Sequence, residues 1–398
     1  MDVIIVGAGV AGLAAARGLL RAGHRVRVYE QAAAPRTGGA AVLMFSNGTA
    51  VLHDLGVTLD GVGARIDRQD AMTADGRLRM RMDYAHTAAR YGFECRAVSR
   101  RDLVARLADG LPADLVRYGR ECRSVTQDAD RVTVTFADGA TDSADVLIGA
   151  DGRHSAVRRC LWGDGHVRPA AFGTWQGLSR IDVDVARSHH GLMITGREGA
   201  CGLLPAGGGL LQWWFDVRWS PADPRPAAPL AELRRRFGHW ASPVPEVLAA
   251  ASEDDLGFFG HHWIRVRRVW GSGRITLAGD AAHVMPPTTG QGANQALEDA
   301  WVLARELADP AAGPGADLGA DGAAPGGGPG VQRGADPAAR LRAYERARYP
   351  RVRLVARLTR LNPANWRIPP LIGRLLSETS QTGMLARYSN RLTAAPAR

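Results

Sequence analysis

The sequence predicts an α/β fold, and three observations lead to this class. The chain opens with an apolar strand at 3–6, a helix at 10–22 and a second strand at 25–30, which together form a βαβ unit. Between about 170 and 270 the pattern changes to short, aromatic-rich strand segments, which indicate a separate sheet. Residues 340–393 are predicted to be helices broken at prolines, so the fold should end in a helical tail.

The composition is typical of a folded protein with one large domain or two closely packed domains. Of the 398 residues, 45% are hydrophobic and 23% are charged, and no apolar run approaches the length of a membrane span. The apolar N-terminus carries Asp2 and regularly spaced glycines, so we interpret it as folded sequence and expect a cytoplasmic protein. The four cysteines are far apart, so we expect neither a metal site nor a disulfide.

The positive charge lies mainly at the C-terminus. The chain has no lysine, so all 50 basic residues are arginine, which excludes Schiff-base, P-loop and lysine-dependent halogenation chemistry. Residues 331–398 hold 14 arginines against three acids. A solvated helix face explains this excess, and because no nucleic-acid motif accompanies it, we expect no nucleic-acid partner. The segment WRIPPLIGRLL offers an alternative, contact with a membrane surface.

The first motif is VIIVGAGVAG, with Gly7, Gly9 and Gly12 between the first strand and the first helix. Glycines allow a tight turn and let a pyrophosphate approach the helix N-terminus, where free N–H groups and the helix dipole favour an anion. Glu30 ends the second strand, where an acid accepts hydrogen bonds from ribose hydroxyls. The motif predicts a dinucleotide but does not distinguish NAD from FAD.

The second motif is VLIGADGRHSAVRR, a buried strand that runs into a turn at Asp151 and Gly152. Taken alone it is also explained as a strand-to-helix turn, with Ser155 as the helix cap.

The third motif is GDAAHVMPPTTGQGANQALEDA, which follows a short apolar strand. Asp280 can accept hydrogen bonds from a polyol, and Pro286 and Pro287 fix a bend. Gly290 and Gly292 let the backbone approach a flat ring, and a helix begins there. Because a reduced flavin carries negative charge, the positive end of a helix suits it. This segment therefore predicts a flavin.

With these residues in this order, the sequence resembles the para-hydroxybenzoate-hydroxylase family of FAD-dependent (class A) monooxygenases. The segment VSRRDLVARL also resembles a family segment and points to Arg100. The resemblance covers nearly the whole chain except residues 310–339, which are rich in Gly, Ala and Pro and are predicted to be a flexible loop.

The resemblance implies a Rossmann-like FAD-binding domain interleaved with a β-sheet substrate domain and followed by C-terminal helices. The expected boundaries are 1–70, 101–168 and 273–309 for the FAD-binding domain, 71–100 and 169–272 for the substrate domain, 310–339 for the loop and 340–398 for the helices.

The resemblance also implies roles for individual residues at the cofactor. At the ADP half the implied contacts are Gly7, Gly9, Gly12 and Glu30, with Arg36 near the adenosine. Arg100 and Asp151 are implied at the pyrophosphate, and Asp280 both at the pyrophosphate and at the ribityl chain. The residues implied at the isoalloxazine are Gly290, Gly292, Ala293 and Asn294.

By the same resemblance the protein is a monooxygenase that hydroxylates an aromatic small molecule. NADPH or NADH reduces FAD, O2 adds at the flavin C4a, and the hydroperoxide transfers one oxygen to the ring. A monomer or homodimer is expected. An epoxidase or reductase of a lipophilic isoprenoid or polyene is the alternative, and a non-catalytic binding protein is disfavoured because the flavin motifs are intact. His283 could serve as a base, but its place in the motif favours a structural role.

The substrate side is predicted less directly. The strand LLQWWFDV places Trp213 and Phe215 on one face and Gln212 and Trp214 on the other. The resemblance favours Trp213 for the pocket, with Phe215 and with Trp175 of another strand, although all three could equally be core residues.

Two further positions bear on the substrate. Pro287 matches a family proline whose carbonyl faces the substrate, and Thr288 follows it. Where bacterial urate hydroxylase of this family holds its purine with an arginine and an aspartate, this chain has Cys201 and Thr288. The expected substrate is therefore a phenolic, indolic or polyketide-type ring rather than urate.

Overall fold

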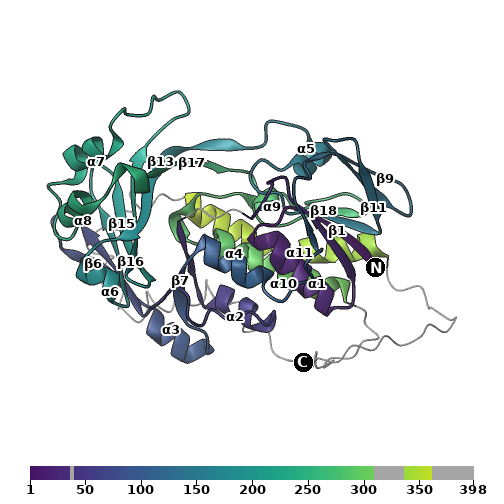
Figure 1. The fold of residues 1–398 in the computed structure, drawn as a ribbon, viewed down its shortest axis with the longest axis horizontal. Coiled ribbons are helices and arrows are strands. Elements are labelled where there is room, and N and C mark those ends of the chain that lie inside the picture. The colour runs from purple at the N-terminus through teal and green to yellow at the C-terminus, as the bar shows by residue number, and fades with distance from the viewer. Residues whose placement is uncertain (36–39, 309–335, 361–398) are drawn as a thin grey trace.

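The computed structural model of the chain describes residues 1–35, 40–308 and 336–360. The predicted mixed α/β architecture is observed, as two lobes connected by two long strands (Figure 1). We call the lobe built around the first strand the Rossmann-like domain and the other lobe the sheet domain. Within the described residues, no helix is long and apolar enough to cross a membrane.

A five-stranded parallel sheet forms the centre of the Rossmann-like domain. Its order is β18 (Ile275–Leu277), β12 (Val146–Gly149), β1 (Asp2–Val6), β2 (Arg25–Tyr29) and β8 (Val116–Arg117). The apolar side chains of the three strands β18, β12 and β1 are almost completely buried. Because these neighbours are parallel, their carboxyl ends share one edge of the sheet. The three sequence motifs, which each begin where one of these strands ends, are thereby brought together.

Helices and two small sheets complete this domain. The helices are α1 (Val10–Arg21), α2 (Ser46–Asp54), α4 (Arg100–Ala108), α5 (Ala156–Trp162), α9 (Asp280–His283) and α10 (Gly292–Leu307), and the turn η2 (Pro287–Thr289) precedes α10. One small sheet contains β9 (Cys122–Gln127), β10 (Val132–Phe136) and β11 (Thr141–Ala144), and the other contains β3 (Ala41–Met44), β7 (Cys95–Ser99) and β4 (Ala64–Ile66). Helices α1 and α10 pack against each other (Figure 1).

The sheet domain is built on seven strands. Their order is β17 (Gly257–Trp263), β13 (Arg168–Arg180), β16 (Leu210–Arg218), β15 (Ala200–Gly207), β14 (His190–Thr195), β5 (Arg68–Thr73) and β6 (Leu78–Asp83). Helices α7 (Pro229–Phe237) and α8 (Val244–Ala250) share a buried core with this sheet, and α3 (Tyr84–Tyr91), α6 (Asp184–Arg187) and η1 (Glu253–Asp255) complete the domain. Strands β5 and β6 come from early in the chain, so the two domains are interleaved in sequence.

The last described helix, α11 (Pro337–Arg360), corrects one prediction. A helix break was expected at Pro350, but the helix continues through this residue. A proline removes one helical hydrogen bond, and here tertiary packing outweighs that loss. Tyr344 before the proline and Val352 after it are both fully buried, because α11 packs along α10. The breaks predicted beyond residue 360 lie outside the described residues.

Candidate active site

Three glycines shape the loop between β1 and α1. Gly7 adopts a φ of 105°, and a Cβ atom there would lie 2.5 Å from the carbonyl oxygen of Ala150. A Cβ atom on Gly12 would lie 1.9 Å from the carbonyl oxygen of Gly7, so the helix closes directly against the loop. A Cβ atom on Gly9 would meet no described atom within 4 Å. The loop is therefore compact on its protein side and open at the start of α1, where free N–H groups favour a phosphate.

Glu30 lies beside this loop, directly after β2. Its Oε2 accepts a hydrogen bond from the N–H of Ala8 at 2.9 Å, and its Oε1 accepts one from Ala32 at 2.9 Å. Two backbone donors thus hold the carboxylate against the glycine loop, next to the open phosphate position.

Asp151 follows β12, and its backbone lies against Gly7. Its Oδ2 accepts hydrogen bonds from the N–H groups of Ala156 at 2.7 Å and Val157 at 3.1 Å. Its Oδ1 is shielded from solvent and has no partner of hydrogen-bonding geometry among the described residues. Burial raises the pKa of this carboxyl, against the opposing effect of the nearby Ser155 hydroxyl. A buried oxygen without a donor costs free energy, so this position fits a bound polar cofactor.

Arg158 connects the second motif to the third, a role that the sequence reasoning missed although the residue lies in the quoted motif. Its buried guanidinium donates to the carbonyl oxygens of Ala281 at 2.9 Å and Asp280 at 3.3 Å. Burial lowers its pKa, and Asp151 opposes that shift. An arginine that binds backbone carbonyls fixes the loop in which Asp280 lies.

The third motif surrounds the same edge of the sheet. Gly279 has a φ of 60°, and its N–H donates to Asp299 Oδ2 at 2.8 Å. The side chain of Asp280 is exposed, and its carboxylate accepts no hydrogen bond from the described residues. Gly290 is left-handed with a φ of 63°, and Gly292 begins α10 beside open space. The motif therefore presents a free carboxylate and a helix N-terminus to one side.

Asn294, in the first turn of α10, is fully buried. Its Oδ1 accepts from the N–H of Phe45 at 2.9 Å, and its Nδ2 donates to the carbonyls of Leu43 at 2.9 Å and Gly290 at 3.0 Å. The side chain is thus used to hold β3 and the Gly290 turn against α10. Ala293 beside it is half-buried.

A buried network of charges attaches α11 to α9 and α10. Asp299 bonds His283 Nε2 at 2.6 Å and Arg348 Nε at 2.7 Å, and Arg348 also pairs with Glu298 at 2.6 Å. Arg351 contacts Glu298 from the solvent side, again at 2.6 Å. Burial alone would raise the pKa of Asp299, but His283 and Arg348 lower it below its ordinary value. His283 is fully buried and is held by this network, so it is structural rather than a base for the substrate.

The two predicted arginines have different outcomes. Arg100 is the exposed first residue of α4, which packs against α1, and its N–H donates to the carbonyl of Ala40 at 3.1 Å. Arg36 lies outside the described residues.

The sheet domain has two distinct faces. On one face, the fully buried Trp213 and Phe215 and the largely buried Trp175 pack with α7 and α8 in a single core. The Nε1 of Trp213 donates to the Ser179 hydroxyl at 3.0 Å. These three aromatic side chains therefore form core and offer almost no surface to a ligand.

The opposite face carries Gln212, Trp214 and Gln176. Gln212 Oε1 accepts from the N–H of Ala41 in β3 at 2.7 Å, and Trp214 is half-buried at a cluster that includes Phe45. Asn294, in the first turn of α10, bonds both Phe45 and Leu43, which lies in the same strand as Ala41. The face that carries Gln212 and Trp214 is therefore turned toward the cofactor motifs. Sequence alternation placed Gln212 and Trp214 on one face, but it gave no signal that this face is turned toward the motifs.

The turn before α10 is engaged with α11. The carbonyl of Pro287 accepts a hydrogen bond from the N–H of Gly290 at 2.8 Å. The hydroxyl of Thr288 donates to the carbonyl of Thr359 at 2.7 Å. Cys201 of β15 lies in the α7–α8 core with Phe215, so it faces away from the motifs. The next residue, Gly202, lies beneath the Trp214 ring and belongs to the face turned toward the motifs.

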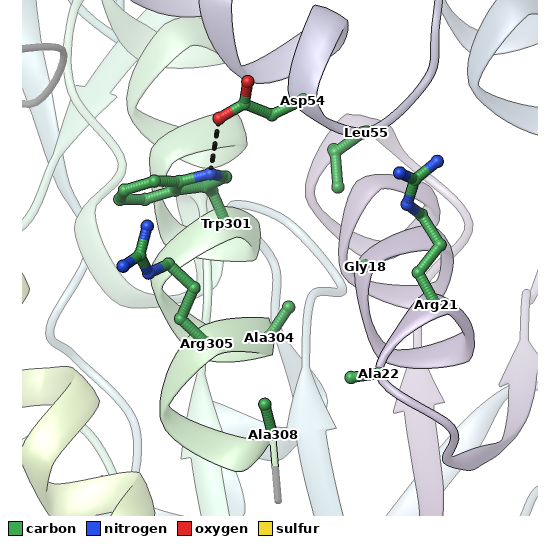
Figure 2. A pocket seen from close by; sticks show the side chains of 9 residues that line it. All are labelled: Gly18, Arg21, Ala22, Asp54, Leu55, Trp301, Ala304, Arg305 and Ala308. Carbon is green, nitrogen blue, oxygen red and sulfur yellow. Dashed lines mark hydrogen bonds between the residues drawn. The ribbon is translucent and has the colours of Figure 1, made fainter. Parts of the chain in front are cut away.

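A separate shallow pocket lies where the C-terminal halves of α1 and α10 meet (Figure 2). Trp301 Nε1 donates to Asp54 at 2.9 Å, and the guanidinium of Arg305 lies 4.5 Å from the centre of the Trp301 ring. Gly18 of α1 and Ala22, the residue directly after that helix, line it at the other end of α1 from the glycine loop. It therefore lies apart from the three motifs.

A glycine loop, a carboxylate with one buried oxygen that has no partner, and a second helix N-terminus lie on one edge of a parallel sheet, an arrangement typical of flavin-binding proteins of the Rossmann-like class. The chain belongs to the FAD binding domain family, which it matches over residues 1–323. It is 35% identical over 401 residues to the 3-amino-4-hydroxybenzoate 2-monooxygenase PtmB3 of Streptomyces platensis, covering 92% of this chain and 89% of the relative. It is 33% identical over 322 residues to an FAD-dependent urate hydroxylase of Klebsiella pneumoniae, covering 78% of this chain and 83% of the relative.

Solved structures agree with this assignment. Klebsiella pneumoniae HpxO complexed with FAD and uric acid superposes with a TM-score of 0.84 at 28% identity, covering 98% of this chain and 96% of that one. A salicylate hydroxylase substrate complex, at 24% identity and a TM-score of 0.75, shares the fold. The predicted family, fold class and FAD cofactor are confirmed, and the protein is an FAD-dependent, NAD(P)H-consuming aromatic hydroxylase. The epoxidase or reductase alternative is not favoured.

Proposed function

We propose that the substrate is a small phenolic ring, bound against the sheet face that carries Gln212, Gln176 and Trp214. The observation that carries this proposal is the hydrogen bond from the Ala41 N–H to Gln212, which holds that face against β3 and beside the N-terminus of α10. The half-buried Gln176 amide can bind a ring substituent and the Trp214 indole can cover an apolar ring, a combination that suits a flat, partly polar ligand. The buried Gln212 amide is occupied by Ala41, Gln176 and Trp213, so it positions this face rather than binding the ring.

The cofactor residues are proposed with specific tasks. The Gly7, Gly9 and Gly12 loop receives the pyrophosphate, and Glu30 binds the ribose hydroxyls beside it. Asp151 Oδ1 and the free carboxylate of Asp280 accept hydrogen bonds from the rest of the chain of FAD. Bound FAD, once reduced by NADPH or NADH, supplies the activation of O2 for transfer of one oxygen atom to the ring.

The remaining predicted contacts divide into two groups. Gly292 and Ala293 offer backbone N–H groups and the helix dipole to the isoalloxazine, and the left-handed Gly290, whose own N–H bonds the Pro287 carbonyl, lets the backbone turn beside it. Asn294 fixes their geometry with its saturated amide. Arg100 is proposed near the pyrophosphate because α4 packs on α1. Trp213, Phe215 and Trp175 support the sheet from its far side and shape the site indirectly.

Urate is disfavoured by two features of the site. The strand β15 presents Gly202 rather than an arginine to the face turned toward the motifs, and the Thr288 hydroxyl is already used by the carbonyl of Thr359. A polar purine would leave its oxygens without cationic partners there. A phenol, as the name of the Streptomyces relative describes, makes fewer such demands.

The test is NAD(P)H oxidation by FAD-loaded protein with 3-amino-4-hydroxybenzoate, salicylate, 6-hydroxynicotinate, urate, an indole and a polycyclic phenol. Products are examined by mass for one added oxygen. At least one phenol should stimulate oxidation with matched oxygen insertion, and urate should not. Insertion into urate alone, or hydrogen peroxide as the only product with every phenol, would contradict the proposal.

A further inference from the structure

Three polar side chains from three adjacent strands form a continuous hydrogen-bonded line. The Thr174 hydroxyl on β13 lies 2.5 Å from Asp216 Oδ1 on β16 and 2.6 Å from His261 Nε2 on β17. Thr174 is only 3% exposed, and the other two side chains are half-buried. Neither the cofactor motifs nor the buried charge network uses these groups.

The line belongs to the sheet face proposed for the substrate. Asp216 pairs with Thr174 in register and lies two residues beyond Trp214 on β16, so it shares that residue's face. On β13, Thr174 lies two residues before Gln176. On β17, His261 lies two residues beyond Phe259, the residue that pairs with Thr174, so Thr174, Asp216 and His261 extend the polar line that Gln212 and Gln176 begin.

Hydrogen counting gives the line two complete arrangements. The Thr174 hydroxyl has one proton and two close partners. With Asp216 ionised, the hydroxyl donates to Oδ1 and accepts from the Nε2–H of His261. With Asp216 protonated, the carboxyl donates to the hydroxyl, and the hydroxyl donates to an unprotonated Nε2, which leaves the proton of His261 on Nδ1. Both contacts of the Thr174 hydroxyl, with Asp216 Oδ1 and with His261 Nε2, are hydrogen bonds in either arrangement.

We propose that Asp216, Thr174 and His261 form a proton relay that takes the hydroxyl proton of a phenolic substrate. His261 Nδ1 accepts that proton, the Nε2 proton passes to the Thr174 oxygen, and the Thr174 proton passes to Asp216 Oδ1. The substrate becomes a phenolate, Asp216 becomes neutral, and the imidazole changes tautomer without changing charge. The inference rests on the proposed function, because a phenolate ring is the better nucleophile for an electrophilic oxygen.

The surroundings of the line make Asp216 a better proton acceptor and keep the His261 ring neutral. Burial raises the pKa of Asp216 to about 6, so it is an ionised acceptor at neutral pH and a stronger base than an exposed carboxylate. Burial lowers the pKa of His261 to about 4, with smaller contributions from His262 and Arg153, so the ring stays neutral. Cys201 lies near Asp216, and burial raises its thiol pKa well above the ordinary value, so it adds no charge.

The first test needs no turnover. Nitrogen-15 NMR of histidine-labelled, FAD-loaded protein reports which ring nitrogen of His261 carries the proton. The expected result is the Nε2–H tautomer above about pH 6 and the Nδ1–H tautomer below it, following Asp216. Thr174→Val and Asp216→Asn should abolish this change, and Thr174→Ser, which keeps the hydroxyl, should retain it. A single tautomer across the range, an imidazolium in its place, or a change that survives in Thr174→Val would overturn the relay.

The second test uses whichever phenol of the panel is hydroxylated. Thr174→Val should lower kcat/KM by about 10²-fold, a size typical of lost general base catalysis, and Thr174→Ser should recover most of it. Thr133→Val is the matched control, because its hydroxyl contacts Ser143 in the remote β9–β11 sheet. An unchanged kcat/KM in Thr174→Val contradicts the relay, whereas a panel in which no phenol is hydroxylated contradicts the proposed function instead.

Discussion

Each domain contains a carboxyl group shielded from solvent, Asp299 in the Rossmann-like domain and Asp216 in the sheet domain, and the pKa values of the two are shifted in opposite directions. In the Rossmann-like domain, Asp299 contacts an imidazole and a guanidinium, and its pKa is lowered. In the sheet domain, Asp216 has a hydroxyl as its partner and no cation within salt-bridge distance among the described residues, and its pKa is raised to about 6.

The opposite pKa shifts suit the two carboxyl groups to different tasks, one structural and one in proton exchange. A carboxylate paired with a guanidinium stays ionised, so it can fix helices but does not exchange a proton near neutral pH. A carboxyl with a raised pKa can change its protonation state at little cost. The first arrangement holds α10 and α11 where the flavin is expected, and the second lies where the substrate is expected.

The most disruptive change should be Arg348→Met. It leaves Glu298 and Asp299 buried with fewer cationic partners, and breaking a buried pair from one side costs about 3–5 kcal/mol. Chemical denaturation should show this loss, accompanied by weaker FAD binding because α10 is released. Arg346→Met removes an exposed arginine of the same helix and should change stability by less than about 0.5 kcal/mol. Equal effects of the two variants would show that the network does not fix α11.

The two neighbouring tryptophans of β16 should separate folding from binding within the sheet domain. Trp213→Ala empties a fully buried site and should cost about 3–5 kcal/mol of unfolding free energy. Trp214→Ala, on the half-buried face, should cost less and should mainly raise KM for the phenol. Denaturation curves and steady-state kinetics of both variants make the comparison. A larger KM effect from Trp213 than from Trp214 would reverse our assignment of the faces.

The sequence predicted the Rossmann-like domain better than the sheet domain, for a physical reason. A glycine such as Gly7 or Gly12 meets a local backbone requirement, so its spacing alone carries the information. The face of β16 is different. Alternation separates Trp213 from Trp214, but α7 and α8 decide which of them is covered, and nothing in the strand itself encodes that packing.

Long-range contacts explain the other misses. Thr174, Asp216 and His261 come from separate strands, and no local pattern marks them as partners. The helix through Pro350 depends on α10, which a reading of the tail alone does not include. Arg158 was visible in its motif, but its task became clear only when the carbonyls of Asp280 and Ala281 lay beside it.

Asp151 and Asp299 allow a carboxylate that is proposed to bind the cofactor to be compared with a structural one inside the Rossmann-like domain. Asp151→Asn keeps an oxygen for the N–H groups of Ala156 and Val157 and replaces only the unpaired Oδ1. The apo protein should keep its stability within about 1 kcal/mol, while FAD should bind about tenfold more weakly, the size of one hydrogen bond to a charged group. Flavin fluorescence titration and thermal melts measure the two effects. Asp299→Asn should show the opposite pattern, with loss of stability first.

An effect of similar size is expected in the pH dependence of stability at Asp216. Its folded pKa of about 6 lies above the unfolded value of about 3.9. Between these values the native state binds more protons than the unfolded state, so the wild type loses stability as pH rises from about 4 to 6. Asp216→Asn lacks this loss, and its stability relative to wild type should increase by about 1–2 kcal/mol between pH 4.5 and 7.

Denaturation at the two pH values measures that increase, because any effect of the substitution that does not depend on pH cancels in the difference. Asp164→Asn, at an exposed carboxyl, should show no such increase. A constant difference between Asp216→Asn and wild type would mean that Asp216 titrates like a solvated acid. The sheet domain would then hold its carboxylate as permanently ionised as the Rossmann-like domain holds Asp299, and the distinction between fixed and exchangeable protons would fail.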